Sequence, residues 1–249
     1  MLFFKRILST RKAEPATDRR GTARYTLQAG FPLKTMIGVA GRDELGQVTG
    51  GRIIDWTGRL INLSGSGAQV QMPRTIIAER GDSCRLKLDM QGYVLTVPGS
   101  IAHVAERRDS LVFGLALDLA ASSTAAAYRQ LVEIVALGST LKQTKPLQPD
   151  DSGYLVEQFE GEPLSRLIIW RQMVGREIAA FEFRLKECVV RGLAGCDAVE
   201  CFAGPEARSA SSATGVKRDE IHRLYQWVVL NLAPELPEDV RGFLRSHAA

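Results

Sequence analysis

The sequence predicts a mainly β fold: a small barrel followed by one helix, and then a smaller α+β unit. Short stretches of alternating apolar and polar residues recur over the first half of the chain, separated by glycine, proline and other turn residues. One stretch with helical spacing follows them. The second half then repeats this order, with strand-like stretches first and helix-like stretches last.

The alternating stretches of the first half predict a series of short strands. Pro73 ends one of them, Pro98-Gly99 suggests a bulge within another, and the spacing favours a barrel over a sandwich. The polar, glycine-rich residues 41–51 predict an extended hairpin loop. The predicted strands are 25–33, 53–55 joined to 60–62 through Trp56-Thr57-Gly58, 67–72, 84–88, 93–97 with 100–105, and 111–117.

A helix is predicted after the last of these strands. Ser122, Ser123 or Thr124 can cap its start, and Gly138 is placed to end it. Its apolar face consists of Tyr128, Leu131, Val132 and Val135.

The remaining chain predicts a linker and a second domain. Residues 141–153 contain Pro146 and Pro149 without periodicity and are interpreted as a linker, so residues 154–249 form an uncharacterised α+β domain. Within this domain we expect a loop at 205–215. The predicted strands are 167–170, 181–190 and 199–202, the predicted helices are 221–232 and 237–244, and the expected core aromatic residues are Trp170, Phe181, Phe183 and Trp227.

Composition narrows the possible functions. The chain has 249 residues, 45% of them apolar and 24% charged, as in ordinary globular proteins. The net charge of +4 suits an anionic ligand, but the basic residues are scattered and predict no nucleic-acid partner. No apolar run approaches the roughly 20 residues of a transmembrane helix. These features predict a cytoplasmic protein.

The N-terminal segment, residues 1–17, is predicted to be flexible. Its apolar start is brief and precedes the basic residues, which is the reverse of the order in a secretory signal. A frayed end or short helix is the simpler interpretation. The alternative is a segment that binds a membrane surface or a partner through Phe3 and Phe4.

The four cysteines form no CxxC pair, which is the usual start of a zinc motif. Reduced, partly buried thiols are therefore the main interpretation. A zinc site formed by Cys188, Cys196 and Cys201 is the alternative.

Two short motifs carry the chemistry. Arg19, Arg20 and Arg24 place three guanidinium groups just before a predicted strand, and Asn62-Leu63-Ser64-Gly65-Ser66-Gly67 is a polar turn. A guanidinium group matches the O6 and N7 edge of guanine and also matches phosphate oxygens. Asn and Ser can satisfy the remaining donors and acceptors of the base.

In this order the two motifs resemble the RxxxR and [D/N]xSxxG signature of the PilZ family. Arg20 and Arg24 fill the first half, and Asn62, Ser64 and Gly67 fill the second. The resemblance covers residues 18–137 and implies a PilZ-like domain at 18–140, a six-stranded barrel with a closing helix, and cyclic di-GMP as the ligand.

The resemblance also implies a role for each site residue. Arg20 and Arg24 would contact guanine edges and phosphates, and Arg19 would add a phosphate or stacking contact. Asn62 and Ser64 would meet the second guanine, and Gly67 would allow the turn. Two departures stand out: the interval between Arg24 and Asn62 is long for the family, and Asn62 replaces the Asp of many members.

The predicted function is a bacterial cyclic di-GMP receptor or adaptor in signal transduction, acting on motility, pilus or surface-polysaccharide control through a protein partner. We expect no enzyme activity, metal or cofactor, because the sequence contains no HExxH, P-loop or GxGxxG motif. His103 is interpreted as a packed or edge histidine. The alternatives are a degenerate PilZ-fold adaptor that binds no nucleotide, and a separate activity of the C-terminal unit such as anion or nucleic-acid binding.

Overall fold

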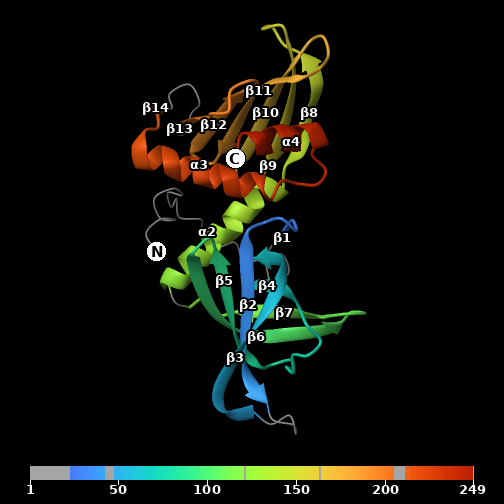
Figure 1. Ribbon diagram of the computed structural model, residues 1–249, viewed down its shortest axis with the longest axis vertical. Helices are drawn as coiled ribbons and strands as arrows, with labels where there is room; N and C mark the ends of the chain where they lie inside the picture. The colour runs from blue at the N-terminus through green and yellow to red at the C-terminus, as the bar shows by residue number, and fades with distance from the viewer. Residues whose placement is uncertain (1–22, 43–47, 121, 163, 205–210, 249) are drawn as a thin grey trace. The chain divides into compact units, whose positions relative to one another are not determined.

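The computed structural model describes residues 23–42, 48–120, 122–162, 164–204 and 211–248 (Figure 1). The described chain divides into two compact units. The first consists mainly of Pro32–Val132, and the second of Glu133–Ala249 together with Gln28–Phe31. The predicted flexible segment 1–17 and part of the predicted loop 205–215 lie outside the described residues.

The first unit is a closed antiparallel barrel. The strand order is β3-β2-β5-β6-β7-β4, and β4 returns to pair with β3, while β1 adds to β3 as an extra strand. This confirms the mainly β fold and the six-stranded barrel. Its strands are β1 (Arg24–Thr26), β2 (Leu33–Arg42), β3 (Val48–Ser64), β4 (Gly67–Met72), β5 (Ser83–Met90), β6 (Tyr93–Glu106) and β7 (Leu111–Leu117).

Alternation along the strands builds the barrel core. In β5, Cys84, Leu86 and Leu88 are buried while the residues between them face outward. Opposite them, Ile37 of β2 pairs with Leu86 and is also fully buried. The period-two pattern that predicted these strands is therefore the pattern that fills the barrel.

Two strand predictions were wrong in detail. The strand predicted over 25–33 ends at Thr26, and the chain turns at Ala29-Gly30 before β2, with Pro32 unable to donate to a ladder. The two pieces predicted around Gly58 form one continuous strand, β3. A Cβ at Gly58 would lie 2.3 Å from the Met72 sulfur, so this glycine serves close packing and not a turn.

The hairpin loop predicted at 41–51 is shorter than expected at both ends. Strand β2 continues to Arg42 and β3 begins at Val48. Residues 43–47 lie outside the described part of the chain.

Helix α2 spans Ser122–Ser139, as the apolar spacing predicted. Gly138 does not end it. A Cβ on Gly138 would lie 2.6 Å from the carbonyl oxygen of Val228 on α3, and Ala233 donates its N–H to the Gly138 carbonyl oxygen at 3.0 Å. The glycine therefore allows the backbone of α2 to approach the end of α3 closely.

The second unit is an antiparallel sheet with two helices on one face. Its strand order follows the chain from β8 to β14. Tyr225 of α3 stacks on Phe181 and meets Phe183 edge-on, and Figure 1 shows α3 and α4 on the same side of this sheet. Its elements are β8 (Lys142–Pro149), β9 (Tyr154–Gly161), β10 (Ser165–Gln172), β11 (Ile178–Leu185), β12 (Cys188–Leu193), β13 (Glu200–Ala203), β14 (Ser211–Ser212), α3 (Gly215–Val229) and α4 (Glu238–Ser246).

Two predictions for the second unit need correction. Most of the stretch interpreted as a linker, residues 141–153, is the edge strand β8, whose pairing with β9 slips in register twice. Its prolines are compatible with a strand because an edge strand need not donate on its outer side. Trp170 is only half-buried and does not belong to the core, whereas Phe181, Phe183 and Trp227 are buried as predicted.

The four cysteines are free thiols, and Cys84, Cys188 and Cys201 are buried while Cys196 is exposed. Among the described residues, no cluster of three or more His, Cys, Asp or Glu side chains could hold a metal ion. No helix in the described part of the chain is both long enough and apolar enough to cross a membrane.

Arg171 joins a buried carboxylate of the second sheet to an exposed carboxylate of α4. Arg171 of β10 donates through Nε to Glu157 of β9 at 2.8 Å, and both side chains are buried. The Nη1 atom of Arg171 donates to Asp239 of α4 and to the Arg176 carbonyl oxygen. Removing the arginine would leave the Glu157 carboxylate buried without its charge partner, which is a costly arrangement.

We therefore predict that Arg171→Met lowers the free energy of unfolding of the second unit by about 3 kcal/mol. Urea unfolding of the full chain, followed by Trp fluorescence and circular dichroism, measures this change. The control is Arg166→Ala, whose ion pair with Glu160 is 4.0 Å long and about half exposed on both sides. An exposed pair is worth less than about 1 kcal/mol, so equal losses in the two variants would contradict the prediction.

Asp239 makes this contact sensitive to pH. Burial favours its neutral form, but the hydrogen bond and charge of Arg171 outweigh burial and hold the pKa of Asp239 below its ordinary value. Because the folded-state pKa is lowered, the stabilisation is complete above the ordinary aspartate pKa, about 4, and is lost as the pH falls below it. We expect Asp239→Asn to reduce the loss of stability between about pH 5 and pH 3 in urea titrations. An unchanged acid dependence would refute this role of Asp239.

Candidate ligand-binding site of the barrel

The two predicted motifs meet because β1 pairs with the end of β3. In this antiparallel register Arg24 lies opposite Ser64, and Thr26 lies opposite Asn62. Segments about forty residues apart in the chain are thus neighbours in one ladder. Arg19 and Arg20 precede β1 and lie outside the described residues.

The turn between β3 and β4 is held from several sides. Ser64 pairs with Gly67 across the hairpin, and the Ser64 hydroxyl donates to the Gly67 carbonyl oxygen at 3.3 Å. The buried Tyr128 hydroxyl of α2 donates to the same oxygen at 2.8 Å. Leu117 of β7 donates its N–H to the carbonyl oxygen of Ser66 at 3.0 Å. Burial raises the pKa of Tyr128, so its hydroxyl remains a donor.

Gly67 is needed at this turn for packing. A Cβ at this position would lie 2.5 Å from the carbonyl oxygen of Leu115 on the paired strand β7. Gly67 is not among the residues with a positive φ. The glycine of the motif therefore brings β4 close to β7, whereas the sequence suggested that it permits a turn.

Four of the six predicted site residues line one small pocket. They are Arg24, Asn62, Ser64 and Gly67, and the pocket volume is about 80 Å³. This space holds only a few water molecules, so a nucleotide would lie over the pocket and not inside it. The other lining residues are Ala68, Gln69, Ala102, His103, Gly114 and Leu115.

Some polar groups of the pocket already make hydrogen bonds within the protein. The Asn62 side-chain amide donates to Gln69 Oε1 at 2.8 Å, which leaves its carbonyl oxygen as an acceptor. The Arg24 side chain is exposed, and the lining includes no carboxylate. A guanidinium group without a lining carboxylate gives the pocket a positive charge that suits an anion.

His103 is a site residue that the sequence did not identify as one. The register between β6 and β7 shifts between Ile101 and His103, and the imidazole lies directly over Gly114. A Cβ on Gly114 would lie 1.8 Å from His103 Cε1, so the glycine leaves room for the ring. In the sequence, the only sign of this site is Gly114, a glycine within a predicted buried strand. The local pattern does not show that His103 is its partner, because a bulge shifts the register between the two strands.

The fold and the site define a small β-barrel with a cationic pocket where β1, β3 and β4 meet. Residues 18–136 match the family model described as PilZ domain, so this part of the chain is a PilZ domain. A search of curated proteins found no match to this chain.

Two solved structures are among those similar to this chain. The PilZ domain of YcgR from Escherichia coli, with c-di-GMP, is 12% identical with a TM-score of 0.35, over 46% of this chain and 89% of that chain. The PlzA protein of Borreliella burgdorferi, in complex with c-di-GMP, is 11% identical with a TM-score of 0.28, over 82% of this chain and 94% of that chain. At such low identity and TM-score, neither structure adds to the argument for this chain.

We predict that Gly67→Ala destabilises the barrel by about 2 kcal/mol, because the new methyl group meets the backbone of β7 and cannot move aside. Thermal and urea unfolding of the full chain measure the change. Gly30→Ala is the matched control, since a Cβ there meets nothing within 4 Å and Gly30 has no positive φ. If the two variants were equally stable, close packing at Gly67 would not be the reason for this glycine.

Proposed function

We propose that the barrel is a receptor for cyclic di-GMP and has no catalytic role. The observation that carries this proposal is the register that sets Arg24 opposite Ser64, so that Arg24 lines one pocket with Asn62, Ser64 and Gly67 of the second motif. The family match to residues 18–136 also supports it. No bound cofactor is needed beyond the nucleotide itself.

In this proposal the arginines and the turn contact different parts of the ligand. The planar guanidinium group of Arg24 can donate two parallel hydrogen bonds to a guanine edge or to a phosphate. Ser64 and the Asn62 carbonyl oxygen offer short polar contacts beside it. Arg19 and Arg20 lie a few residues before Arg24 in the chain and would add contacts to the same anionic ligand. An affinity in the micromolar range, about 8 kcal/mol, is reasonable for such a set of contacts.

The output is proposed to be a change of conformation or of partner binding. Contacts by Arg19 and Arg20 would hold the residues before β1 against the barrel and change its surface. The turn that carries Ser64 is bonded to Tyr128, and α2 continues from Tyr128 to Ser139. A shift of the turn on binding would therefore reach α2 through one hydrogen bond. The cytoplasmic location, the protein partner and control of motility, pili or polysaccharide are parts of this proposal.

Titration calorimetry of the full chain with cyclic di-GMP tests the receptor. We expect micromolar binding, and a loss of at least about tenfold in Arg24→Ala, since hydrogen bonds to charged groups contribute about 1.5–3 kcal/mol. Arg24→Lys should also bind more weakly, because an ammonium group cannot make the paired contact.

Arg59→Ala is the matched control: Arg59 is an exposed arginine of β3 that bonds Gln71 and does not line the pocket. We expect it to bind as the parent does. No binding by the parent chain would reject the receptor and favour an adaptor that keeps the fold without the nucleotide. Equal losses in Arg24→Ala and Arg59→Ala would mean that general charge, and not the pocket, holds the ligand.

A further inference from the structure

The second sheet carries apolar residues on both of its faces. Phe181, Phe183 and Leu167 face α3 and α4 and are fully buried. The opposite face is seen in the register: Trp170 pairs with Ala180, and Ala180 pairs with Leu193. These three residues form an apolar row across β10, β11 and β12. Leu193 at the end of this row is 57% exposed.

A charged row runs beside the apolar one. Glu182 lies opposite Arg191, and Arg191 lies opposite Glu200. The guanidinium group of Arg191 is held by Glu182 at 2.8 Å and lies over the Phe202 ring, 4.9 Å from its centroid. Arg191 is therefore fixed in position, and its charge is balanced within the sheet.

A large hollow lies along these two rows and extends to Arg218 near the start of α3. Its volume is about 970 Å³, near the upper end for small-molecule sites. Its lining includes the small residues Ala179 and Ala180, whose side chains fill little of it. Apolar walls with a few polar groups are typical of ligand sites.

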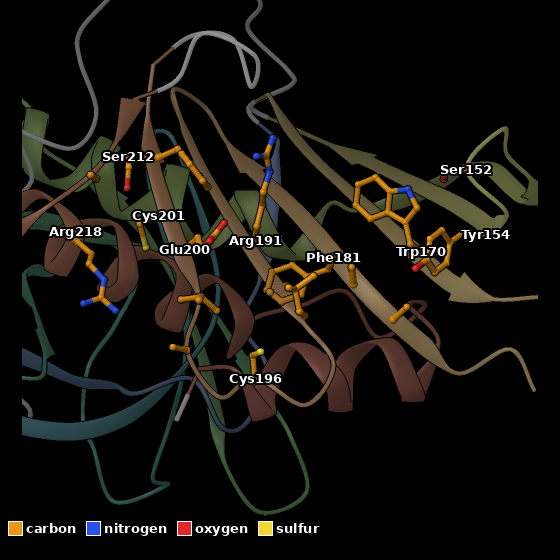
Figure 2. Close-up of a pocket in the computed structure, with 18 residues that line it drawn as sticks. Ser152, Tyr154, Trp170, Phe181, Arg191, Cys196, Glu200, Cys201, Ser212 and Arg218 are labelled. Carbon is orange, nitrogen blue, oxygen red and sulfur yellow. The ribbon is translucent and has the colours of Figure 1, made fainter.

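The two ends of the hollow differ in chemistry. Figure 2 shows Tyr154 and Trp170 at one end and Arg218 at the other, with Arg191 and Glu200 between them. No ion pair joins Arg218 to another residue of the described chain, and its side chain is exposed. The hollow thus combines an aromatic end with an end that carries an unbalanced positive charge.

We propose that the second unit binds a small organic anion with an apolar body in this hollow. A carboxylate would bind at Arg218, where a charge-assisted hydrogen bond is available. The apolar body would lie along Ala180, between Trp170 and Leu193. This ligand is distinct from the nucleotide of the barrel, and the proposal does not depend on it.

An anion fits better than a cation because of how the charges are distributed. Aromatic rings beside a carboxylate can bind an organic cation, and Glu200 is the one lining carboxylate. Glu200, however, lies opposite Arg191, and Arg218 adds a second lining guanidinium group. The guanidinium group of Arg218, which has no ion-pair partner in the described chain, therefore favours an anionic head over a cationic one at its end of the hollow.

Cys196 provides a reporter for occupancy of the hollow. It lines the hollow and is exposed, whereas Cys84, Cys188 and Cys201 are buried. Burial raises the pKa of Cys84 and of Cys201 to about 11 and also raises that of Cys188. Iodoacetamide at pH 8 should therefore alkylate Cys196 first, and mass spectrometry can follow its rate.

The test compares two probes that share an apolar tail. Dodecanoate and dodecyltrimethylammonium, each below its micellar concentration, are titrated into the full chain while the alkylation of Cys196 is measured. We expect bound dodecanoate to cover Cys196 and slow its alkylation at least about fivefold at saturation. The cation should need at least about fivefold higher concentration for the same protection, because a partly exposed charge contact contributes about 1 kcal/mol. No protection by dodecanoate, or equal protection by both probes, would overturn the proposal.

Two variants locate the ligand. Arg218→Ala should weaken dodecanoate binding by about fivefold, as expected for the loss of a partly exposed charge contact. Leu193→Ser should also weaken it, and Leu193 is exposed enough that its replacement leaves the fold intact. Arg245→Ala, an exposed arginine of α4 outside the hollow, is the matched control and should bind as the parent does. Parental binding in both Arg218→Ala and Leu193→Ser would place the anion elsewhere and refute the site.

Discussion

The short ladder between β1 and the end of β3 is the contact on which the barrel site depends. It pairs only three residues on each strand, and one further bond, from the Leu27 N–H to the Ile61 carbonyl oxygen at 3.1 Å, continues it. A three-residue strand contributes little stability by itself. A ligand that contacts both Arg24 and Ser64 would add its binding free energy to this pairing, because it binds only the paired form. The site is therefore suited to couple ligand binding to the order of β1.

The other half of the site, the turn between β3 and β4, is held in place by hydrogen bonds and close packing. Two hydroxyl groups, those of Ser64 and Tyr128, donate to the single carbonyl oxygen of Gly67, and the missing side chain of Gly67 brings β4 against β7. This arrangement needs three strands and a helix in place at once. The pocket thus joins a rigid turn to a marginal strand, and a conformational response to binding would fall on β1 and on the contact with Tyr128.

Local pattern predicted the elements better than their limits or partners. Alternation identified the strands of the barrel because each buries one face, as Leu86 and Leu88 do in β5. The same pattern wrongly predicted one strand over residues 25–33, where β1 ends and β2 begins, because the turn at Gly30 does not interrupt the apolar spacing. It also missed β8, because the signal of an edge strand with two prolines is weak. Of the site, the motif residues were predictable, whereas His103 depended on a bulge and on its partner Gly114, which only the register shows.

Trp170 explains why the second unit was harder to interpret. The run Leu167-Ile168-Ile169-Trp170 is apolar throughout, so its sequence does not say which face is buried. In the structure Leu167 and Ile169 face the helices and are fully buried, while Trp170 lies on the other face and is half-buried. The outer face carries an apolar row beside a charged row, and the helices cover only the opposite face. The hollow beside Trp170 leaves this apolar row uncovered, and it extends to the cationic side chain of Arg218 near the start of α3, so its lining suits a ligand with an apolar body and an anionic head.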